Sequence, residues 1–408
     1  MEYTRRSLLK AAFTLPAGTW LARYHALAAP ARKMVKITGI KAMQVQRGGN
    51  CLVKVETDAG LVGYGEAGST GPMARARIET LKRFLIGEDP LAIDRHFEVM
   101  TSQMHAFMAH IPTISGIDIA LWDLAGKILN VPVSTLMGGP FRDKVRLYIN
   151  SAPKDLLNPG ACREWADRMK ADPNGWSTFK MTFMALLDGN KAAAQISPLL
   201  SRRELARIER GFNNVREALG PEYDIVVHCH NEFDLPSATG IGRAVEASQP
   251  MWLEDPMPVQ WTESWIALKR AVRVPILTGE KLEMPRQFFP FLHNQAVDMI
   301  QPDLAFSGGL TGCRKIADLA ALYNIPLNTH NVGTLPLTMA SVHFGAAIRN
   351  YTTSENALTP GNIVLEMGTE RPVVKNSYMD VPKEPGLGFD LDPDVLRKNV
   401  KPGEPWWD

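Results

Sequence analysis

The feature that most constrains the fold of this chain is a regular series of charged residues placed after short apolar runs. The series is Glu254, Glu280, Asp303, His330 and Glu355, separated by 26, 23, 27 and 25 residues, and its first four members close an apolar run. One strand, its returning helix and two loops take about this length of chain, so each interval predicts one βα unit. Polar residues at the C-terminal ends of parallel barrel strands meet at one mouth, where barrel enzymes hold their active sites. We therefore expect a βα barrel with these five side chains around its mouth.

The segment before the predicted barrel has the pattern of a small α+β domain. Apolar and polar residues alternate in 34–41 and 51–57, as they do in strands. The turn Asp58-Ala59-Gly60 separates the second of these from residues 61–66, which predicts a hairpin. Residues from about 72 to 130 carry apolar positions at helical spacing. A chain of 408 residues is long enough for such a domain and a large barrel.

These patterns predict four parts along the chain. They are a signal peptide at 1–28, a capping domain at 34–144, the barrel at 145–370, and a C-terminal segment at 371–408 that packs back on the cap. A Gly138-Gly139-Pro140 breaker precedes the first barrel-like strand. The segment 184–203 is too long for a tight βα loop, and lids and specificity loops are the usual occupants of such places.

The N-terminus resembles an export signal. Arg5 and Arg6 precede a mildly apolar stretch, and Ala26-Leu27-Ala28 has the pattern of a cleavage site. This arrangement is typical of twin-arginine signals, so we predict a periplasmic protein; a basic amphipathic leader helix is the alternative.

Most of the apparent basic charge belongs to this leader. Removing residues 1–28 takes away four basic residues and one acidic residue, which changes the formal net charge from +2 to −1. Nucleic-acid binding then loses its electrostatic basis. We also expect no membrane partner after cleavage, because no apolar run is long enough to cross a bilayer. The four cysteines lack CxxC spacing and the density of a disulfide framework.

Two histidines end the apolar run that begins at Asp224. The strand period of two points His228 and His230 to the same side and Cys229 to the other. His228 lies 26 residues before Glu254, in step with the other intervals, so both imidazoles are predicted at the barrel mouth. A pair of buried core histidines is the alternative reading of this short motif.

The strand-end series divides into two kinds of site. Glu254 and Glu280 lie on neighbouring strands, where two close carboxylates repel each other and a divalent cation relieves the repulsion. Asp303 and His330 lie on successive strands, close enough for the carboxylate to hold one imidazole nitrogen. That contact raises the basicity of the other nitrogen and gives a general base.

These residues, with several longer stretches, resemble a known family. The stretches are 53–67, 116–127, 253–256, and 301–303 followed by His330. Over residues 34–408 the chain resembles the enolase superfamily, in its mandelate racemase and acid-sugar dehydratase branch. The resemblance implies an α/β fold in which an α+β N-terminal capping domain covers a modified (β/α)7β TIM-like barrel. It also implies Mg²⁺ at the mouth and abstraction of the proton α to a carboxylate, which needs preorganised positive charge because that proton is weakly acidic.

The resemblance assigns roles to the strand-end residues. Glu254 and Glu280 match metal ligands. Asp303 and His330 match the dyad in which His330 takes the α-proton. Glu355 matches the acid that hydrogen-bonds the substrate carboxylate on the side away from the metal.

Four other positions are compared with the family pattern. Lys180 fits the lysine that neutralises the substrate carboxylate, while Thr182 replaces a second lysine that acts as a base, which argues against two-base racemisation. His230 fits the histidine that protonates the departing hydroxyl in mannonate and galactonate dehydratases. Trp406, near the C-terminus, closes the sugar pocket or packs on the cap.

His228 is a departure from the family, which has a metal-binding Asp at this position. Imidazole is a poorer ligand for Mg²⁺ than carboxylate and favours Mn²⁺, Zn²⁺ or Fe²⁺. A mixed nitrogen and oxygen site for another metal, a weak Mg²⁺ site and a site no longer used all stay open.

The resulting hypothesis is a metal-dependent dehydratase of a sugar acid, of the aldonate or uronate type. His330 removes the C2 proton, the metal on His228, Glu254 and Glu280 holds the carboxylate, and His230 expels the C3 hydroxyl as water. The partner is then a small sugar acid, and barrels of this type often form homo-oligomers. The alternatives are an epimerase or cycloisomerase on the same site and a non-catalytic sugar-acid binding protein.

Overall fold

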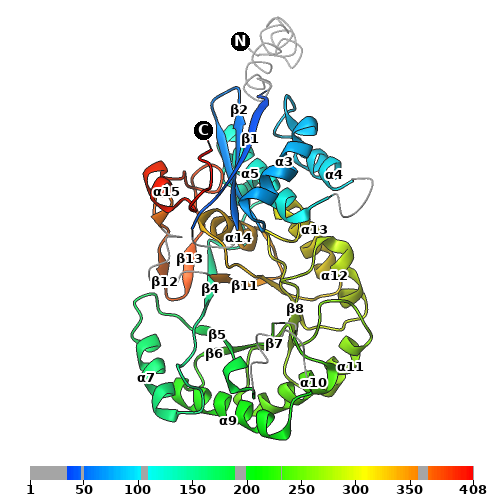
Figure 1. Ribbon diagram of the computed structural model, residues 1–408, viewed down its shortest axis with the longest axis vertical. Coiled ribbons are helices and arrows are strands. Elements are labelled where there is room, and N and C mark those ends of the chain that lie inside the picture. The colour runs from blue at the N-terminus through cyan, green and yellow to red at the C-terminus, as the bar shows by residue number, and fades with distance from the viewer. Residues whose placement is uncertain are drawn as a thin grey trace, which may run out of the picture.

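The computed structural model describes residues 35–46, 50–102, 109–188, 199–230, 232–356 and 366–407. The predicted leader and half of the long segment at 184–203 lie outside these ranges. Figure 1 shows a small cap, in blue and cyan, above a larger barrel whose helices lie around its outside. Within the described ranges no helix has both the length and the apolar character needed to cross a membrane.

The cap is a three-stranded antiparallel sheet covered by helices. The order is β1-β2-β3, and the predicted hairpin is confirmed because Cys51 pairs with Ala67 and Glu56 with Val62. Its elements are β1 (Ile37–Gln44), β2 (Cys51–Thr57), β3 (Val62–Ala67), α3 (Gly71–Leu85), α4 (Ile93–Thr101), α5 (Ile111–Leu129) and α6 (Val133–Leu136). Helix α5 lies directly against β3 at Gly65, where a Cβ atom would come within 2.1 Å of the Gly116 carbonyl oxygen. Glycine therefore sets the close approach of helix and sheet.

The barrel contains eight parallel strands and closes by pairing its last strand with its first. The sheet runs β4-β5-β6-β7-β8-β9-β10-β11, and β11 pairs with β4. The strands are β4 (Lys144–Asn150), β5 (Thr178–Thr182), β6 (Asp224–His228), β7 (Trp252–Glu254), β8 (Ile276–Thr278), β9 (Met299–Ile300), β10 (Leu327–Thr329) and β11 (Tyr351–Asn356).

A helix follows each barrel strand except the last. They are α7 (Pro159–Lys170), α9 (Arg202–Leu219), α10 (Leu235–Ala244), α11 (Ser264–Ala271), α12 (Met284–His293), α13 (Gly309–Leu322) and α14 (Leu335–Ala347), with short 3-10 helices η3 (Met184–Leu186) and η4 (Glu246–Ser248). This alternation confirms the predicted (β/α)7β barrel and capping domain.

A separate apolar cluster fills the barrel interior below the mouth. It consists of Tyr148, Val226, Trp252, Leu277 and Met299, one from each of five strands. The Tyr148 and Trp252 rings meet edge to face, with centroids 5.8 Å apart. Edge-to-face contacts of this kind favour one ring orientation, so the interior is a packed floor for the polar mouth above it.

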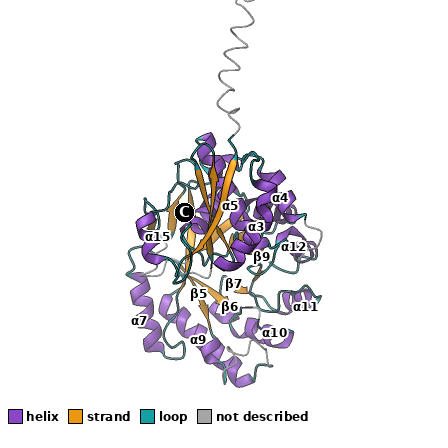
Figure 2. Ribbon diagram, turned by 45° about the horizontal axis from the view of Figure 1, so that its top comes forward, coloured by secondary structure: helices purple, strands orange, loops and turns teal. Residues whose placement is uncertain are grey.

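The C-terminal segment does more than pack on the cap. Its first part forms β12 (Val374–Lys375) and β13 (Tyr378–Asp380), and β13 pairs antiparallel with the first three residues of β4. Its second part contains α15 (Pro393–Asn399), and Lys54 of the cap sheet donates a 3.0 Å hydrogen bond to the Trp407 carbonyl. Figure 2 shows α15 beside the cap. The segment therefore contacts both parts of the molecule.

Two buried carboxylates join the cap to the first turns of barrel helices. Glu66 of β3 accepts hydrogen bonds from the Thr334 N–H (2.9 Å), the Thr334 hydroxyl (2.6 Å) and the Leu337 N–H (3.4 Å) at the start of α14. Asp118 of α5 accepts a 2.9 Å bond from the Thr311 N–H in α13. Helix N-termini carry unpaired N–H groups and favour negative charge, so these contacts stabilise the joint.

Candidate active site at the barrel mouth

The five strand-end residues meet at the barrel mouth as the spacing predicts. Glu254 ends β7 and Glu355 lies in β11, while Glu280, Asp303 and His330 follow β8, β9 and β10 within three residues. Each is buried except His330, which is half-buried. Four acidic groups in one buried place repel each other, so cationic partners decide what this site can bind.

Asp303 and His330 form the predicted dyad. Their residues pair as a parallel β-bridge, which brings the side chains together, and Nδ1 of His330 lies 2.6 Å from Oδ2 of Asp303. The other nitrogen, Nε2, lies 3.4 Å from Oε2 of Glu280 and 3.8 Å from Oε2 of Glu355. Burial opposes a charge on this imidazole, but Glu355 and the bond to Asp303 outweigh it and raise the pKa of His330 to about 10. The carboxylates around His330 therefore stabilise the imidazolium that forms when the neutral ring takes up a proton.

Lys180 lies at the centre of the acidic group. This side chain projects from β5, and its Nζ contacts Oε1 of Glu254, lies 3.0 Å from Oε2 of Glu355 and 3.9 Å from Oε2 of Glu280. Burial disfavours its charge, but the carboxylates outweigh that and raise the pKa of Lys180 above its usual range. Lys180 is thus a fixed cation, able to neutralise a carboxylate as predicted. In this structure its partners are the carboxylates of the protein itself.

Neutral polar residues that the sequence analysis did not single out hold Glu355 in place. Asn150 donates a 2.6 Å hydrogen bond to Oε1 of Glu355, and the Tyr148 hydroxyl donates a 3.3 Å bond to Oε2. Gln301 Nε2 lies 3.4 Å from Oε1 of Glu254 and 3.5 Å from Oε2 of Glu355. Gln301 belongs to the 301–303 stretch that supports the family resemblance, which is the one signal that could have found it.

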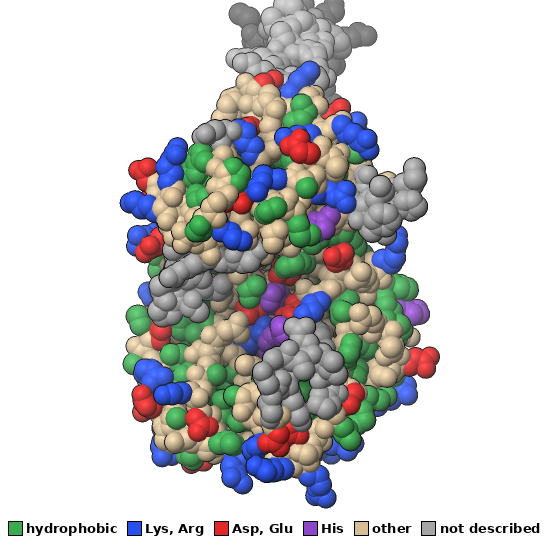
Figure 3. Space-filling view, viewed as in Figure 1, with side chains coloured by type: hydrophobic (Ala, Val, Ile, Leu, Met, Phe, Trp, Pro, Cys, Tyr) green, Lys and Arg blue, Asp and Glu red, His purple; other side chains and the backbone are tan. Residues whose placement is uncertain are grey.

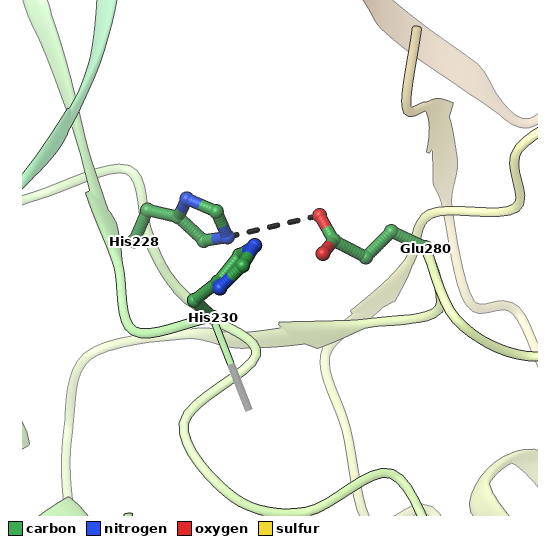
Figure 4. A group of neighbouring side chains, drawn as sticks. All are labelled: His228, His230 and Glu280. Carbon is green, nitrogen blue, oxygen red and sulfur yellow. Dashed lines mark ion pairs between the residues drawn. The ribbon is translucent and has the colours of Figure 1, made fainter. Parts of the chain in front are cut away.

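His228, the last residue of β6, and His230, two residues after it, lie side by side at the same mouth. Figure 4 shows the His228 and His230 rings facing the Glu280 carboxylate. The ring centroids are 5.0 Å apart, and the ligand atoms of all three residues lie within 4.8 Å of one another. Cys229 between them is buried, and His230 has a left-handed backbone with φ of 60°, so the predicted strand period ends before it. Burial, with Lys180 and His230 nearby, holds the pKa of His228 well below its usual range, so its imidazole is neutral.

These residues fit a divalent cation. Nε2 of His228 and Oε2 of Glu280 are buried, and neither has a hydrogen-bond partner among the described residues. A buried polar atom without a partner costs roughly 1–3 kcal/mol, and a bound ion that contacts both atoms would remove that cost. A neutral imidazole and a carboxylate are both metal ligands. Glu254, the third predicted ligand, lies 3.7 Å from the same His228 nitrogen but contacts Lys180.

A cavity opens beside this group of residues. Its volume is about 580 Å³, and Asn150, Lys180, Thr182, His228 and His230 are among its lining residues. Figure 3 shows a hollow between cap and barrel in which histidine, acidic and basic side chains lie together. The cavity has the size of a small-ligand site.

Trp406 lies away from this cavity. Its ring packs under the Arg397 guanidinium of α15, 4.3 Å from the ring centroid, and it is not among the described side chains that line the cavity. The structure thus places Trp406 against α15 of the C-terminal segment. A role in substrate binding stays a prediction that this position does not support.

Comparisons with known proteins agree with the geometry. The model of the mandelate racemase/muconate lactonizing enzyme N-terminal domain matches residues 27–138, and the enolase C-terminal domain-like model matches residues 161–395. A D-xylonate dehydratase of Haloferax volcanii is 37% identical over 361 residues, 88% of this chain and 87% of that protein. A D-galactonate dehydratase of Ralstonia pickettii is 28% identical and covers 87% of this chain and 92% of its own. The crystal structure of a mandelate racemase/muconate lactonizing enzyme-like protein from Rubrobacter xylanophilus superposes with a TM-score of 0.83, at 29% identity over 91% of this chain and 99% of that chain.

Proposed function

This chain belongs to the mandelate racemase/muconate lactonizing enzyme family of the enolase superfamily, and on that premise we propose that it is a metal-dependent sugar-acid dehydratase. The single observation that carries the proposal is the dyad, with His330 held at 2.6 Å by Asp303 and facing the Lys180 and Glu355 pair. A base and a carboxylate-binding cation at one mouth are what removal of an α-proton requires.

The residues of the chain divide the reaction between them. His330 accepts the C2 proton, and Asp303 and Glu355 stabilise the imidazolium that forms. Lys180 neutralises the substrate carboxylate as negative charge develops on its oxygens. A divalent metal, when bound by His228 and Glu280 with Glu254 as the predicted third ligand, supplies further positive charge there. His230, which lines the same cavity, is the predicted acid for the departing C3 hydroxyl.

The relatives narrow the substrate class. Proteins named D-xylonate and D-galactonate dehydratase match this chain over most of its length. Both names describe aldonic acids, so we propose that the substrate is an acid of this class and that the product is its 2-keto-3-deoxy derivative. Export through the twin-arginine route and a homo-oligomeric assembly are part of the same proposal, supported by Arg5 and Arg6 and by the barrel architecture.

A dehydration screen tests the activity. The purified protein is incubated with a library of aldonic and uronic acids in the presence of Mg²⁺, Mn²⁺ or Zn²⁺, and the 2-keto product is measured. We expect turnover of at least one aldonic acid and its loss in His330→Asn, with the circular dichroism spectrum of the variant unchanged. Unchanged turnover in this variant would contradict the assignment of the base. Solvent deuterium entering C2 without loss of water would show an epimerase instead, and binding without turnover would show a binding protein.

A further inference from the structure

Glu254, the third metal ligand expected by resemblance, has all of its oxygens occupied by the protein. Lys180 contacts Oε1, and Gln301 Nε2 lies 3.4 Å from the same oxygen. The Trp252 indole N–H donates a 3.0 Å hydrogen bond to Oε2. The carboxylate is fully buried. Breaking a buried charge pair of this kind costs about 3–5 kcal/mol, which a cation would have to offset before Glu254 could bind it.

His230 has the opposite arrangement. Its Nδ1 lies 3.1 Å from Oε1 of Glu232, and Lys281 fixes its backbone through a 2.8 Å hydrogen bond to the His230 carbonyl. The contact with Glu232 leaves Nε2 for another partner. Metal-binding histidines commonly donate their second ring nitrogen to a carboxylate in this way, which fixes the ring and strengthens it as a ligand. Glu232 therefore prepares His230 to bind a cation.

The two unpartnered atoms of the mouth lie next to this imidazole. Nε2 of His228 and Oε2 of Glu280 are 3.7 Å apart and have no hydrogen-bond partner among the described residues. Glu280 is only 7% exposed. Together with His230 these residues offer two imidazole nitrogen ligands and one oxygen ligand on one side of the mouth.

We propose that His228, His230 and Glu280 bind one transition-metal ion of the Zn²⁺, Co²⁺ or Fe²⁺ class in preference to Mg²⁺, and that Lys180 rather than the metal neutralises Glu254. Two imidazoles suit these ions, whereas Mg²⁺ prefers oxygen ligands and retains its water. The proposal rests on the proposed function, since it concerns the metal of that reaction, and it changes the role of one residue. A ring nitrogen that binds a metal cannot deliver a proton, so His230 is then a ligand and not the acid.

Metal binding measured without substrate tests the proposal. The full chain is treated with a chelator, dialysed, and titrated with Zn²⁺, Co²⁺ or Mg²⁺ by isothermal calorimetry, while the visible absorption of Co²⁺ reports nitrogen ligands. We expect one site that binds Zn²⁺ and Co²⁺ more than about tenfold more tightly than Mg²⁺. Equal affinity for Mg²⁺ and Co²⁺ would overturn the nitrogen-rich site.

Three variants identify the third ligand. His230→Ala should weaken Co²⁺ binding more than Glu232→Gln, whose loss of a supporting contact should cost about 10–100-fold. Glu254→Gln, the matched control, should weaken Co²⁺ binding less than His230→Ala does and should leave the visible Co²⁺ spectrum unchanged, because it removes a nearby charge and not a ligand. If Glu254→Gln loses Co²⁺ affinity and His230→Ala does not, the proposal is overturned, and Glu254 is a metal ligand as the family resemblance implies. His228→Asp should shift the preference towards Mg²⁺, because it replaces a nitrogen ligand with oxygen.

The outcome separates this proposal from the proposed function. If no sugar acid is dehydrated but the His230 and Glu254 variants behave as expected, the dehydratase assignment fails and the metal site stands. If dehydration occurs and metal-saturated His230→Ala loses kcat while its metal affinity is unchanged, the dehydratase assignment stands, His230 is the acid, and the metal proposal fails.

Discussion

Two buried glutamates show how differently this protein uses the same side chain. Glu66, in the joint between cap and barrel, is fully buried, and both of its oxygens accept hydrogen bonds from Thr334. Glu280, at the barrel mouth, is 7% exposed, and its Oε2 accepts no hydrogen bond within the described part of the chain. That oxygen instead lies 3.4 Å from the His330 imidazole and 3.7 Å from that of His228.

The difference lies in what surrounds each carboxylate. Backbone N–H groups at the start of a helix are fixed by the fold and cannot leave, so the Glu66 joint is complete without any ligand. The histidine and lysine side chains around Glu280 are not fixed by the backbone and can move when a cation or a substrate binds. Glu280 can therefore exchange one of these side chains for a ligand. A buried carboxylate paired with the main chain is therefore structural here. A buried carboxylate that is surrounded by lysine and histidine side chains belongs to a binding site.

Replacing Lys180, the cation at the centre of the barrel mouth, should change the free energy of unfolding more than the other substitutions proposed below. Lys180→Met leaves Glu254 and Glu355 buried without the positive charge that they share. Breaking a buried pair by removing one partner costs about 3–5 kcal/mol, so the metal-free variant should be less stable by that amount. The measurement is denaturant unfolding in the presence of a chelator. Lys180→Arg, which keeps the charge, should lose less, and an unchanged free energy of unfolding in Lys180→Met would show that the mouth does not depend on this lysine.

Replacing glutamate with glutamine at Glu66 and at Glu280 should show directly how the joint differs from the barrel mouth. Glu66→Gln keeps one acceptor oxygen for Thr334 but replaces Oε1, which also accepts the Thr334 N–H, with an NH2 group, which should destabilise the protein by about 1–3 kcal/mol with or without metal. Glu280→Gln removes an oxygen that accepts no hydrogen bond, so the metal-free melting temperature should change less. The rise in melting temperature on adding Co²⁺ should disappear in Glu280→Gln and persist in Glu66→Gln. The opposite pattern would place the metal elsewhere.

The spacing of charged residues was enough to predict the mouth, because a barrel brings every strand end to the same place. The dyad followed from it, since consecutive strands are neighbours and Asp303 and His330 each end one. A βα barrel and an α+β cap followed from the same intervals and from the hairpin pattern before them, while the (β/α)7β form was implied by the family resemblance. Apart from that form, these predictions use only chain order and the strand period, which the sequence displays directly.

Partner choice inside the site could not be predicted in this way. The sequence predicted that Lys180 neutralises a substrate carboxylate. Only the packed structure shows that it also contacts two carboxylates of the protein, those of Glu254 and Glu355. Tyr148 and Asn150 are neutral, and neutral polar residues at strand ends are too common to carry a signal. Strands β12 and β13 are two and three residues long, too short to show an alternating pattern, so their addition to the barrel sheet was missed.

Asp118 is an intermediate case that tests the comparison through pH. One of its oxygens accepts the Thr311 N–H, as in the Glu66 joint, but Oδ1 has no hydrogen-bond partner among the described residues, as at the mouth. Burial raises the pKa of this carboxyl to about 7 from its usual 3.8. No lysine or histidine of the described part of the chain forms an ion pair with Asp118, so burial favours its protonated form, whereas the clustered Glu280 is proposed to bind a metal.

The sign of the pH effect follows from this raised pKa. At pH 5 the unfolded chain has already lost the Asp118 proton while the folded chain keeps it, so unfolding releases a proton and stability falls as pH rises between about 4 and 7. Between pH 5 and 6 the wild type should lose about 1 kcal/mol relative to Asp118→Asn, whose amide keeps an acceptor for Thr311 and cannot ionise. Parallel denaturant unfolding of the two proteins at both pH values cancels every other titrating group. If the difference in the free energy of unfolding between the two proteins stays constant with pH, Asp118 is charged in the folded protein. The joint, like the mouth, then holds its carboxylates as anions.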